Sequence, residues 1–467
     1  MQNEENINNL SVDLDSEKKS DNKIDHEQEI LPKIETSEKF SKKFLFISLE
    51  GDGIDLAWKV KQEGNEVKMY IERDEDQDVG DGFVEKIDDW HQFIDWSDVI
   101  VFDNVFSGDN SSGKIADELR ERGKFVVGGS SYTDRLELDR EFGQEEMKSV
   151  GMLTLPHWDF DNFNSAIDFL KSTPGRYIFK PSGGDLDKSL LFIGKEDDGR
   201  DLLEVLEHNK KSWSHKIKRF QLQKFVSGIE IAAGAFFNGH DFITPININF
   251  EHKKLFPGDI GPYTGEMGTL MFWIEPNSFF NSTLGKMIDK LRESKYVGYI
   301  DINCIINGKG IYPLEFTSRF GYPTISIHME GILSPMGEFL YAIARGEQYP
   351  LKTQKGFQVG VVIAIPPFPY HDEKVLQIYK DSSILFKKNN FEGIHLGDVK
   401  LVDDDWKLAG KSGWALIVTG SNSTVDDARK QAYRRIENIM LQNMFYRTDI
   451  GSKWFEESDE LHTWGIL

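Results

Sequence analysis

The stretch YIDINCIINGKGIYPLEFTSRFG, residues 299–321, reads as two β-strands joined by a tight turn. Polar and apolar residues alternate on both sides of the Asn-Gly-Lys-Gly sequence at 307–310, which is typical of a hairpin. In a strand, Glu315, Thr317 and Arg319 share one face because successive side chains point to opposite sides. The sequence therefore predicts a polar strand face within a largely apolar sheet.

The length of the turn decides whether the partner strand adds to this face. A three-residue loop pairs position 303 with 315 and position 301 with 317, whereas a two-residue loop shifts the register and separates the acidic side chains. With the longer loop, four oxygen-bearing side chains meet, namely Asp301, Asn303, Glu315 and Thr317. Such all-oxygen sites suit Mg²⁺, and Arg319 lies where phosphoryl charge can be stabilised. A salt-bridged sheet face is the alternative.

Two lysines upstream are candidates for binding phosphate. Lys180 ends a β run and is followed by Pro-Ser-Gly-Gly, so that glycine backbone N–H groups and an ammonium can surround phosphate oxygens. Lys188 would reach the same phosphates from the next strand. The alternative for each is a surface lysine beside a turn.

The segment FQLQKFVSGIEIAAGAF, residues 220–236, is a candidate for binding a nucleoside. Gln223, Lys224 and Val226 precede a Ser-Gly turn, and an adenine can pair with the main-chain groups of such an edge. Glu230, which follows the turn, can accept hydrogen bonds from ribose hydroxyls. An ordinary hairpin is the alternative.

A glycine-dense polar stretch, FEHKKLFPGDIGPYTGEMGT at 250–269, predicts a functional loop. Ordering a long loop that has no core of its own is costly, so such loops usually serve binding or catalysis.

Composition limits the classes of function. The 467 residues carry a net charge of −23, which argues against a nucleic-acid groove, because such a groove needs a basic surface. No apolar run reaches the roughly 18 residues of a membrane span, and the polar N-terminus predicts no signal peptide. The single cysteine, Cys304, excludes an intramolecular disulfide. We expect a cytoplasmic protein without nucleic-acid or membrane partners; the oligomeric state is not indicated.

Changes of pattern along the chain divide it into four parts. Residues 1–40 hold 11 acidic residues against 5 lysines and predict a disordered acidic tail. Strands and helices alternate over 41–135, which predicts a parallel Rossmann-like sheet. We expect hairpins and mixed α+β structure over 136–349, and a further domain over 350–467.

Several separated motifs resemble the ATP-grasp ligase family, and within it phosphoribosylamine–glycine ligase. They occur in the family's order: LAWK on the first helix, GPYTGEMG, EFTSRFG, GVVIA and the C-terminal NMFYRTDIG. The resemblance covers nearly all of the chain after the tail. It implies a Rossmann-like domain, a two-lobed ATP-grasp domain and a small β-rich C-terminal domain, an α/β and α+β architecture.

The resemblance also implies a reaction and its residues. ATP would phosphorylate a carboxylate, and an amine would attack the acyl phosphate to give an amide, ADP and phosphate. The implied cofactors are ATP and Mg²⁺ or Mn²⁺. The metal ligands would be Glu315, Thr317 and Asp301, and the catalytic cations Arg319 and Lys253. ATP would contact Lys180, Lys188, Gln223, Lys224, Val226 and Glu230. The substrates would contact His252, Asp259, Gly261, Pro262, Thr264, Gly265, Met267 and Gly268.

Departures from the family pattern concentrate on the substrate side. Thr317 replaces an asparagine, and Tyr322-Pro323-Thr324 replaces an Asp-Pro-Glu element. The first turn reads GDGIDL in place of a Gly-Arg-Glu-His sequence. The interpretation is therefore a carboxylate–amine ligase of the phosphoribosylamine–glycine ligase type, in which the departures reflect either sequence drift with the function kept or a new acceptor or donor. A nucleotide-binding relative with a regulatory or scaffold role is the alternative; an NAD-dependent oxidoreductase is poorly supported because GDGIDL lacks the third glycine of the dinucleotide fingerprint.

Overall fold

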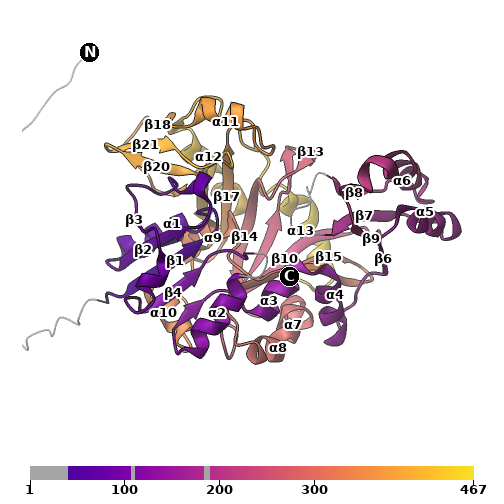
Figure 1. Cartoon of the computed structure of the whole chain (residues 1–467), viewed down its shortest axis with the longest axis horizontal. Coiled ribbons are helices and arrows are strands. Elements are labelled where there is room, and N and C mark those ends of the chain that lie inside the picture. The colour runs from indigo at the N-terminus through magenta and orange to yellow at the C-terminus, as the bar shows by residue number, and fades with distance from the viewer. Residues whose placement is uncertain (1–39, 107–110, 183–189) are drawn as a thin grey trace, which may run out of the picture. The chain divides into compact units, whose positions relative to one another are not determined.

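The computed structural model describes residues 40–106, 111–182 and 190–467, and its elements are labelled in Figure 1. The first described part is a parallel sheet in the order β3-β2-β1-β4-β5. Its strands are β1 (Lys43–Ser48), β2 (Glu66–Ile71), β3 (Glu85–Lys86), β4 (Val99–Phe102) and β5 (Val126–Val127). Crossovers pass through α1 (Ile54–Gln62) and α2 (Ser112–Glu121). The predicted Rossmann-like parallel sheet is confirmed.

A four-stranded antiparallel sheet, in the order β6-β9-β7-β8, follows α3 (Ser131–Leu138) and α4 (Arg140–Ser149). Its strands are β6 (His157–Phe160), β7 (Tyr177–Ser182), β8 (Phe192–Ile193) and β9 (Arg219–Lys224). The helices α5 (Phe163–Ser172) and α6 (Arg200–Trp213) lie beside it at the right of Figure 1. They bury an aromatic core that includes Phe179 and Phe220, separate from the main core.

An eight-stranded antiparallel sheet forms the largest layer, in the order β16-β15-β10-β11-β14-β17-β22-β19. Its strands are β10 (Ile229–Asn238), β11 (Ile246–Glu251), β14 (Gly268–Ile274), β15 (Val297–Asn307), β16 (Gly310–Thr317), β17 (Phe357–Ala364), β19 (Ile394–Leu396) and β22 (Trp414–Asn422). Because β17 pairs with β14, the C-terminal strands continue the same sheet beyond position 350.

The remaining elements surround these sheets. The hairpin β12 (Lys254–Phe256) and β13 (Ile260–Tyr263) lies within the glycine-dense loop, and a small sheet holds β18 (Ser383–Phe386), β20 (Val399–Val402), β21 (Asp405–Leu408) and β23 (Ile439–Met440). The other helices are α7 (Ser278–Ser282), α8 (Ile288–Glu293), α9 (Thr324–Gly331), α10 (Met336–Ala344), α11 (Glu373–Tyr379), α12 (Val425–Ile436) and α13 (Lys453–Thr463). Among the described residues, no helix is both long enough and apolar enough to cross a membrane.

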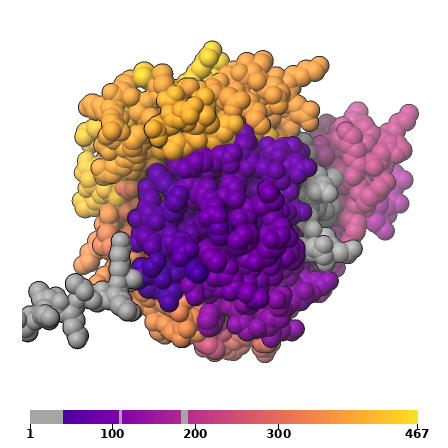
Figure 2. All heavy atoms as spheres, turned by 60° about the vertical axis from the view of Figure 1, so that its left-hand side comes forward, coloured from indigo at the N-terminus to yellow at the C-terminus, as the bar shows by residue number. Residues whose placement is uncertain are grey.

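The loop after β2 packs directly against the C-terminal hairpin of β20 and β21. Gly80 N donates to Val399 O over 2.8 Å, and Leu401 N donates to Asp81 O over 2.8 Å. Figure 2 shows this neighbourhood, with orange and yellow C-terminal atoms lying along the indigo to purple N-terminal residues. The parallel sheet and the C-terminal residues are therefore joined through backbone hydrogen bonds.

A half-buried histidine links the same two regions. His395 Nδ1 lies 2.8 Å from Asp55 Oδ2 on α1, and His395 Nε2 lies 2.9 Å from Thr419 Oγ1. The Thr419 hydroxyl donates to Glu330 Oε2 over 2.9 Å, and Arg435 donates to Glu330 Oε1 over 2.8 Å. Burial alone would lower the pKa of His395, but the Asp55 carboxylate outweighs it and raises that pKa. The imidazolium is thus the form that fits this network.

We predict that this network stabilises the fold most at low pH. A histidine with a raised folded-state pKa contributes fully below its unfolded pKa of about 6.5 and loses that contribution as pH rises through the folded pKa. His395→Gln should therefore lower the free energy of unfolding by about 3 kcal/mol at acidic pH. This loss in the free energy of unfolding should be smaller at alkaline pH. Urea unfolding of the variant and the wild type across the pH range measures it.

His371→Gln is the matched control, because His371 is exposed. This control should unfold like the wild type at every pH. A His395→Gln penalty that stays constant with pH would show that the neutral imidazole already fits the network.

Candidate active site

The hairpin of β15 and β16 places the predicted oxygen cluster on one sheet face. Its turn has two residues, with Asn307 opposite Gly310. A β-bulge then leaves Leu314 as an extra residue, so that Asn303 lies opposite Glu315 and Asp301 opposite Thr317. The expected pairing is present, but the three-residue loop expected to produce it is wrong: a two-residue turn plus the bulge restores the register.

Lys253 lies at the centre of three carboxylates from three strands. Its Nζ is 2.8 Å from Glu230 Oε1, 3.2 Å from Glu251 Oε2 and 3.9 Å from Glu315 Oε1. Burial disfavours the charged amine, but these carboxylates outweigh it and raise the pKa of Lys253 well above its usual value. The Lys253 charge in turn lowers the pKa of Glu230. Lys253 is therefore a fixed cation.

Buried oxygens beside this lysine fit a divalent metal ion. Asp301 and Asn303 are buried, and the Oδ1 atom of each has no hydrogen-bond partner among the described residues. Burial and the neighbouring Glu251 charge raise the pKa of Asp301 well above its usual value, so a cation is needed to keep it ionised. Within the described ranges, no three His, Cys, Asp or Glu residues by themselves form a group that could hold a metal. Mg²⁺ is commonly bound by one or two protein carboxylates together with substrate phosphates.

Arg319 is anchored by a helix of the preceding segment. Its Nε donates to Glu137 Oε1 over 3.2 Å, and the same carboxylate accepts from Ser318 N over 2.8 Å. Glu137 lies on α3, which begins at a capping box made by Ser130 and Thr133. The guanidinium is thereby held at the end of β16, beside the oxygen face.

Lys180 approaches the oxygen face from the four-stranded sheet. Burial and the positive charge of Arg140 lower the pKa of Lys180 to about 8, whereas Glu315 and Glu230 act in the opposite direction. Lys180 therefore interacts electrostatically with two of the carboxylates that pair with Lys253. Lys188 lies outside the described residues.

The predicted nucleoside segment runs along the end of β9. Gln223 is fully buried, and neither side-chain atom has a hydrogen-bond partner among the described residues. Lys224 lies 4.6 Å above the Tyr177 ring, and Val226 is half-buried in the connection to β10. A buried amide without partners is an arrangement that a bound polar ligand would satisfy.

The glycine-dense loop is held by the C-terminal motif RTDIG. Arg447 is buried and donates to Asp259 Oδ1 over 2.8 Å, while its Nε and Nη2 bond both oxygens of Asp449 at 2.8 and 2.7 Å. His252 Nε2 accepts from Gly451 N over 3.0 Å. Burial, with the charges of Lys453 and Arg447, lowers the pKa of His252 to about 3, so its ring is neutral.

The other predicted loop residues divide between surface and interior. Thr264 is buried and its hydroxyl donates to Lys253 O over 2.9 Å. The buried residues Met267 and Gly268 lie at the start of β14, which leads into the sheet. Exposed or half-buried positions are Gly261, Pro262 and Gly265. The loop therefore has an anchored base and an accessible tip.

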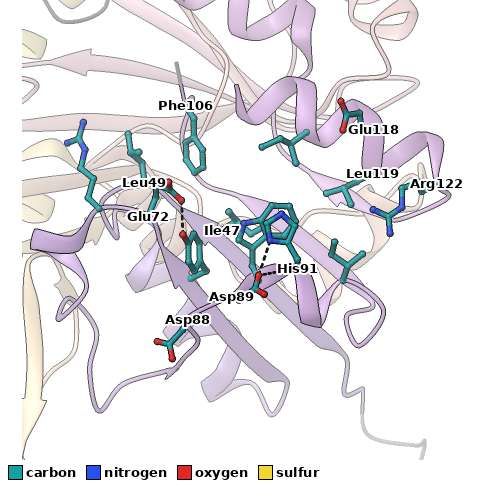
Figure 3. Close-up of a pocket in the computed structure, with 15 residues that line it drawn as sticks. Ile47, Leu49, Glu72, Asp88, Asp89, His91, Phe106, Glu118, Leu119 and Arg122 are labelled. Carbon is teal, nitrogen blue, oxygen red and sulfur yellow. Dashed lines mark hydrogen bonds and ion pairs between the residues drawn. The ribbon is translucent and has the colours of Figure 1, made fainter. Parts of the chain in front are cut away.

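A cavity of about 730 Å³ lies elsewhere, between the parallel sheet, α2 and the 3₁₀ helix η2 (Trp90–Phe93). Figure 3 shows its apolar floor, including Ile47 and Leu119, and its charged rim, including Glu72, Glu118 and Arg122. None of the predicted site residues lines this cavity.

Sequence reasoning missed several residues that shape the site: Glu137, Glu251, Glu266, Arg447 and Lys453. Glu266 is buried, accepts the Thr269 hydroxyl, and has its pKa raised well above the usual value by burial and by Glu251. Lys453 Nζ donates to Glu251 O over 2.8 Å. Glu266 lies within the motif GPYTGEMG, and Arg447 lies within NMFYRTDIG. Their place in these motifs is the sequence signal that could have identified them as site residues.

Comparison with known proteins gives matches over the same segments. Residues 138–325 match the phosphoribosylglycinamide synthetase ATP-grasp (A) domain, and residues 358–453 match its C domain. A phosphoribosylamine–glycine ligase of Streptococcus pneumoniae is 25% identical over 73% of this chain and 81% of that protein. One from Halalkalibacterium halodurans is 22% identical over 88% and 97%, respectively.

The fold has a solved counterpart. The crystal structure of phosphoribosylamine–glycine ligase from Thermotoga maritima has a TM-score of 0.66 at 22% identity, over 88% of this chain and 100% of that chain. The two domain matches together span more than half of the sequence. The chain belongs to the phosphoribosylglycinamide synthetase family of ATP-grasp ligases.

Proposed function

We propose that this family member uses ATP to join a small-molecule carboxylate to an amine, as a phosphoribosylamine–glycine ligase-like enzyme of purine biosynthesis or of a related nucleotide or amino-acid ligation. The observation that carries the proposal is the meeting of three cations with an oxygen-rich sheet face. Lys180 and Lys253, from different segments, interact with Glu315, and Arg319 interacts with Asp301 on the same sheet face. Phosphoryl transfer depends mainly on such positioning and charge stabilisation.

The reaction would proceed in two balanced steps. A carboxylate oxygen attacks the γ-phosphorus of ATP, the bond to ADP breaks, and an acyl phosphate forms. The amine nitrogen then attacks the acyl carbon, phosphate leaves, and the nitrogen loses a proton to give the amide. Lys180 would hold the ATP phosphates, and Arg319 with Lys253 would offset the charge that moves onto the leaving phosphate.

The metal site belongs to the proposal as well. Glu315, Asp301 and Thr317 would hold Mg²⁺ or Mn²⁺, with Thr317 the weakest ligand because a hydroxyl replaces the family's asparagine. When bound, the ion would offset the negative charge of the ATP phosphates. Gln223, Lys224, Val226 and Glu230 would bind the nucleoside.

The loop from His252 to Gly268 would lie at the substrate end. A cytoplasmic location and three functional parts, 41–135, 136–349 and 350–467, complete the proposal. A regulatory relative without catalysis is not favoured, because the cations and the metal-type oxygens are both present.

The direct test supplies ATP, Mg²⁺, glycine and freshly generated phosphoribosylamine to the purified full chain. Amide formation with one ADP released per amide would support the proposal. A panel of other amino acids and amines extends the test to different substrates. ATP that binds without ADP release for any pair would overturn the ligase proposal.

We predict that Glu315→Gln lowers turnover at least about 100-fold, since the neutral amide cannot hold the metal beside the phosphates. The measurement is ADP release at saturating ATP and Mg²⁺. Glu347→Gln is the matched control, because Glu347 is an exposed residue paired with Arg345. Normal turnover in Glu315→Gln would show that the metal assignment is wrong.

We predict that Lys180→Met weakens ATP binding about 10- to 100-fold, because it removes a phosphate-directed charge from a partly desolvated site. Isothermal titration calorimetry with a non-hydrolysable ATP analogue measures the change. Lys171→Met is the matched control. Lys171 lies on α5, is exposed and pairs with Glu207, so this variant should bind the ATP analogue as tightly as the wild type does. Equal affinities for all three proteins would exclude Lys180 from the phosphate site.

A further inference from the structure

One face of the parallel sheet is covered less completely than the other. The face that carries Phe44 and Phe46 packs against α1 in the main core, whereas the face that carries Leu45 and Ile47 packs against α2 and η2. Parallel strands are usually joined through an α-helix. Here α1 has nine residues and α2 has ten, but the connection from β3 to β4 contains only the four-residue η2. Figure 3 shows the cavity that results between η2, α2 and the sheet.

This cavity has the size and the lining of a small-molecule site. Its volume is about 730 Å³, and small-molecule sites typically measure roughly 300 to 1,000 Å³ and are mostly apolar with a few polar groups. Its apolar floor is formed by the end of β1, by α2, by the end of η2 and by the segment after β4, through Ile47, Leu49, Ile94, Phe106, Ile115 and Leu119. A ligand that covers this floor would remove apolar surface from water.

Carboxylates outnumber arginines in the lining of the cavity. The charged residues that line it, apart from His91, are Glu72, Asp88, Asp89, Glu118, Arg73 and Arg122. Arg73 pairs with Glu50, which does not line the cavity. Asp89 accepts from His91 N over 3.0 Å and lies 2.8 Å from His91 Nδ1. Setting these two pairs aside leaves three carboxylates and one arginine, so the cavity has an excess of negative charge.

Two of the remaining carboxylates lie on neighbouring segments beside Tyr70. Tyr70 Oη donates to Glu72 Oε2 over 2.7 Å. Asp88 directly follows Ile87, whose N donates to Met69 O over 3.0 Å, so the segments after β2 and β3 stay side by side. Burial, with the hydrogen bond to Glu72, raises the pKa of Tyr70 to about 12, which keeps its hydroxyl protonated. This side of the cavity therefore combines carboxylates with an aromatic ring, and both attract cations.

We propose that this cavity is a second ligand site, which binds a small organic cation with an apolar body. The body would lie on the floor formed by Ile47, Leu49 and Leu119, and the cationic group would face Glu72 and Asp88. An anion of the same shape would meet the carboxylates, so charge determines which ligands bind. A metal ion would leave the apolar floor uncovered, which favours an organic ligand. The inference does not depend on the proposed ligase function, because none of the residues assigned to ATP, metal or substrates lines the cavity.

The test compares three probes that share a phenyl ring and differ in charge, namely 2-phenylethylamine, 2-phenylethanol and 3-phenylpropionate. Binding to the purified full chain is followed by ligand-observed NMR titration at neutral pH, with and without a non-hydrolysable ATP analogue and Mg²⁺. The amine should bind at least about tenfold more tightly than the carboxylate, with the alcohol between them. The ATP analogue should leave all three affinities unchanged, since the cavity is separate from the ATP-grasp site.

Three variants locate the binding in the cavity. Glu72→Gln removes a carboxylate but keeps an oxygen that can accept from Tyr70. Because Glu72 is exposed, the variant should weaken amine binding only about threefold, and the affinity for the alcohol should not change. Glu121→Gln is the matched control, because Glu121 is an exposed carboxylate on α2 that does not line the cavity. Ile115→Trp places a larger side chain in the cavity and should abolish binding of every probe.

Equal or tighter binding of the carboxylate, or no measurable binding of the amine to the wild type, would overturn the inference. Loss of the amine when the ATP analogue is added would also overturn it, because the probe would then occupy the ATP-grasp site. Unchanged binding in a folded Ile115→Trp variant would do the same. If Ile115→Trp unfolds, the wild-type affinities and the comparison of Glu72→Gln with Glu121→Gln decide. Amide formation with ADP release is a separate readout, so either proposal can fail without the other.

Discussion

The Lys253 ammonium is the charge around which the polar face of the eight-stranded sheet is organised. Carboxylates from β10, β11 and β16 approach it, and without a cation they would repel one another in a poorly solvated place. Their meeting requires three strands to keep one register. The bulge at Leu314 is therefore a condition for this arrangement, because a slip of one residue would turn Glu315 to the opposite face.

The C-terminal residues belong to this site as much as the central ones do. Strands β17 and β22 extend the same sheet, and Arg447 ties the glycine-dense loop through Asp259 and Asp449. His395 joins Asp55 on the first helix to the C-terminal sheet. The C-terminal residues therefore support both the glycine-dense loop and the first helix.

Local patterns predicted much of this architecture. Alternating strands and helices indicated the parallel sheet, and Asn-Gly-Lys-Gly indicated the hairpin that carries Glu315. The hydrogen-bond partner of His252 could not be predicted from the sequence. Its Nε2 accepts from Gly451 N, which belongs to a segment far along the chain, and no residue next to His252 indicates that partner. Glu137 was missed for the same reason, since only tertiary packing brings α3 to Arg319.

The sequence by itself determined the family, the order of the sheets and the residue types of an ATP-dependent site, because motifs, periodicity and turn residues are local properties of the chain. Only the tertiary structure decided which charges meet. It corrected the turn of the hairpin and placed three carboxylates around Lys253. Burial and the distances between charges set pKa values and ligand preference, and both arise only when distant segments pack together.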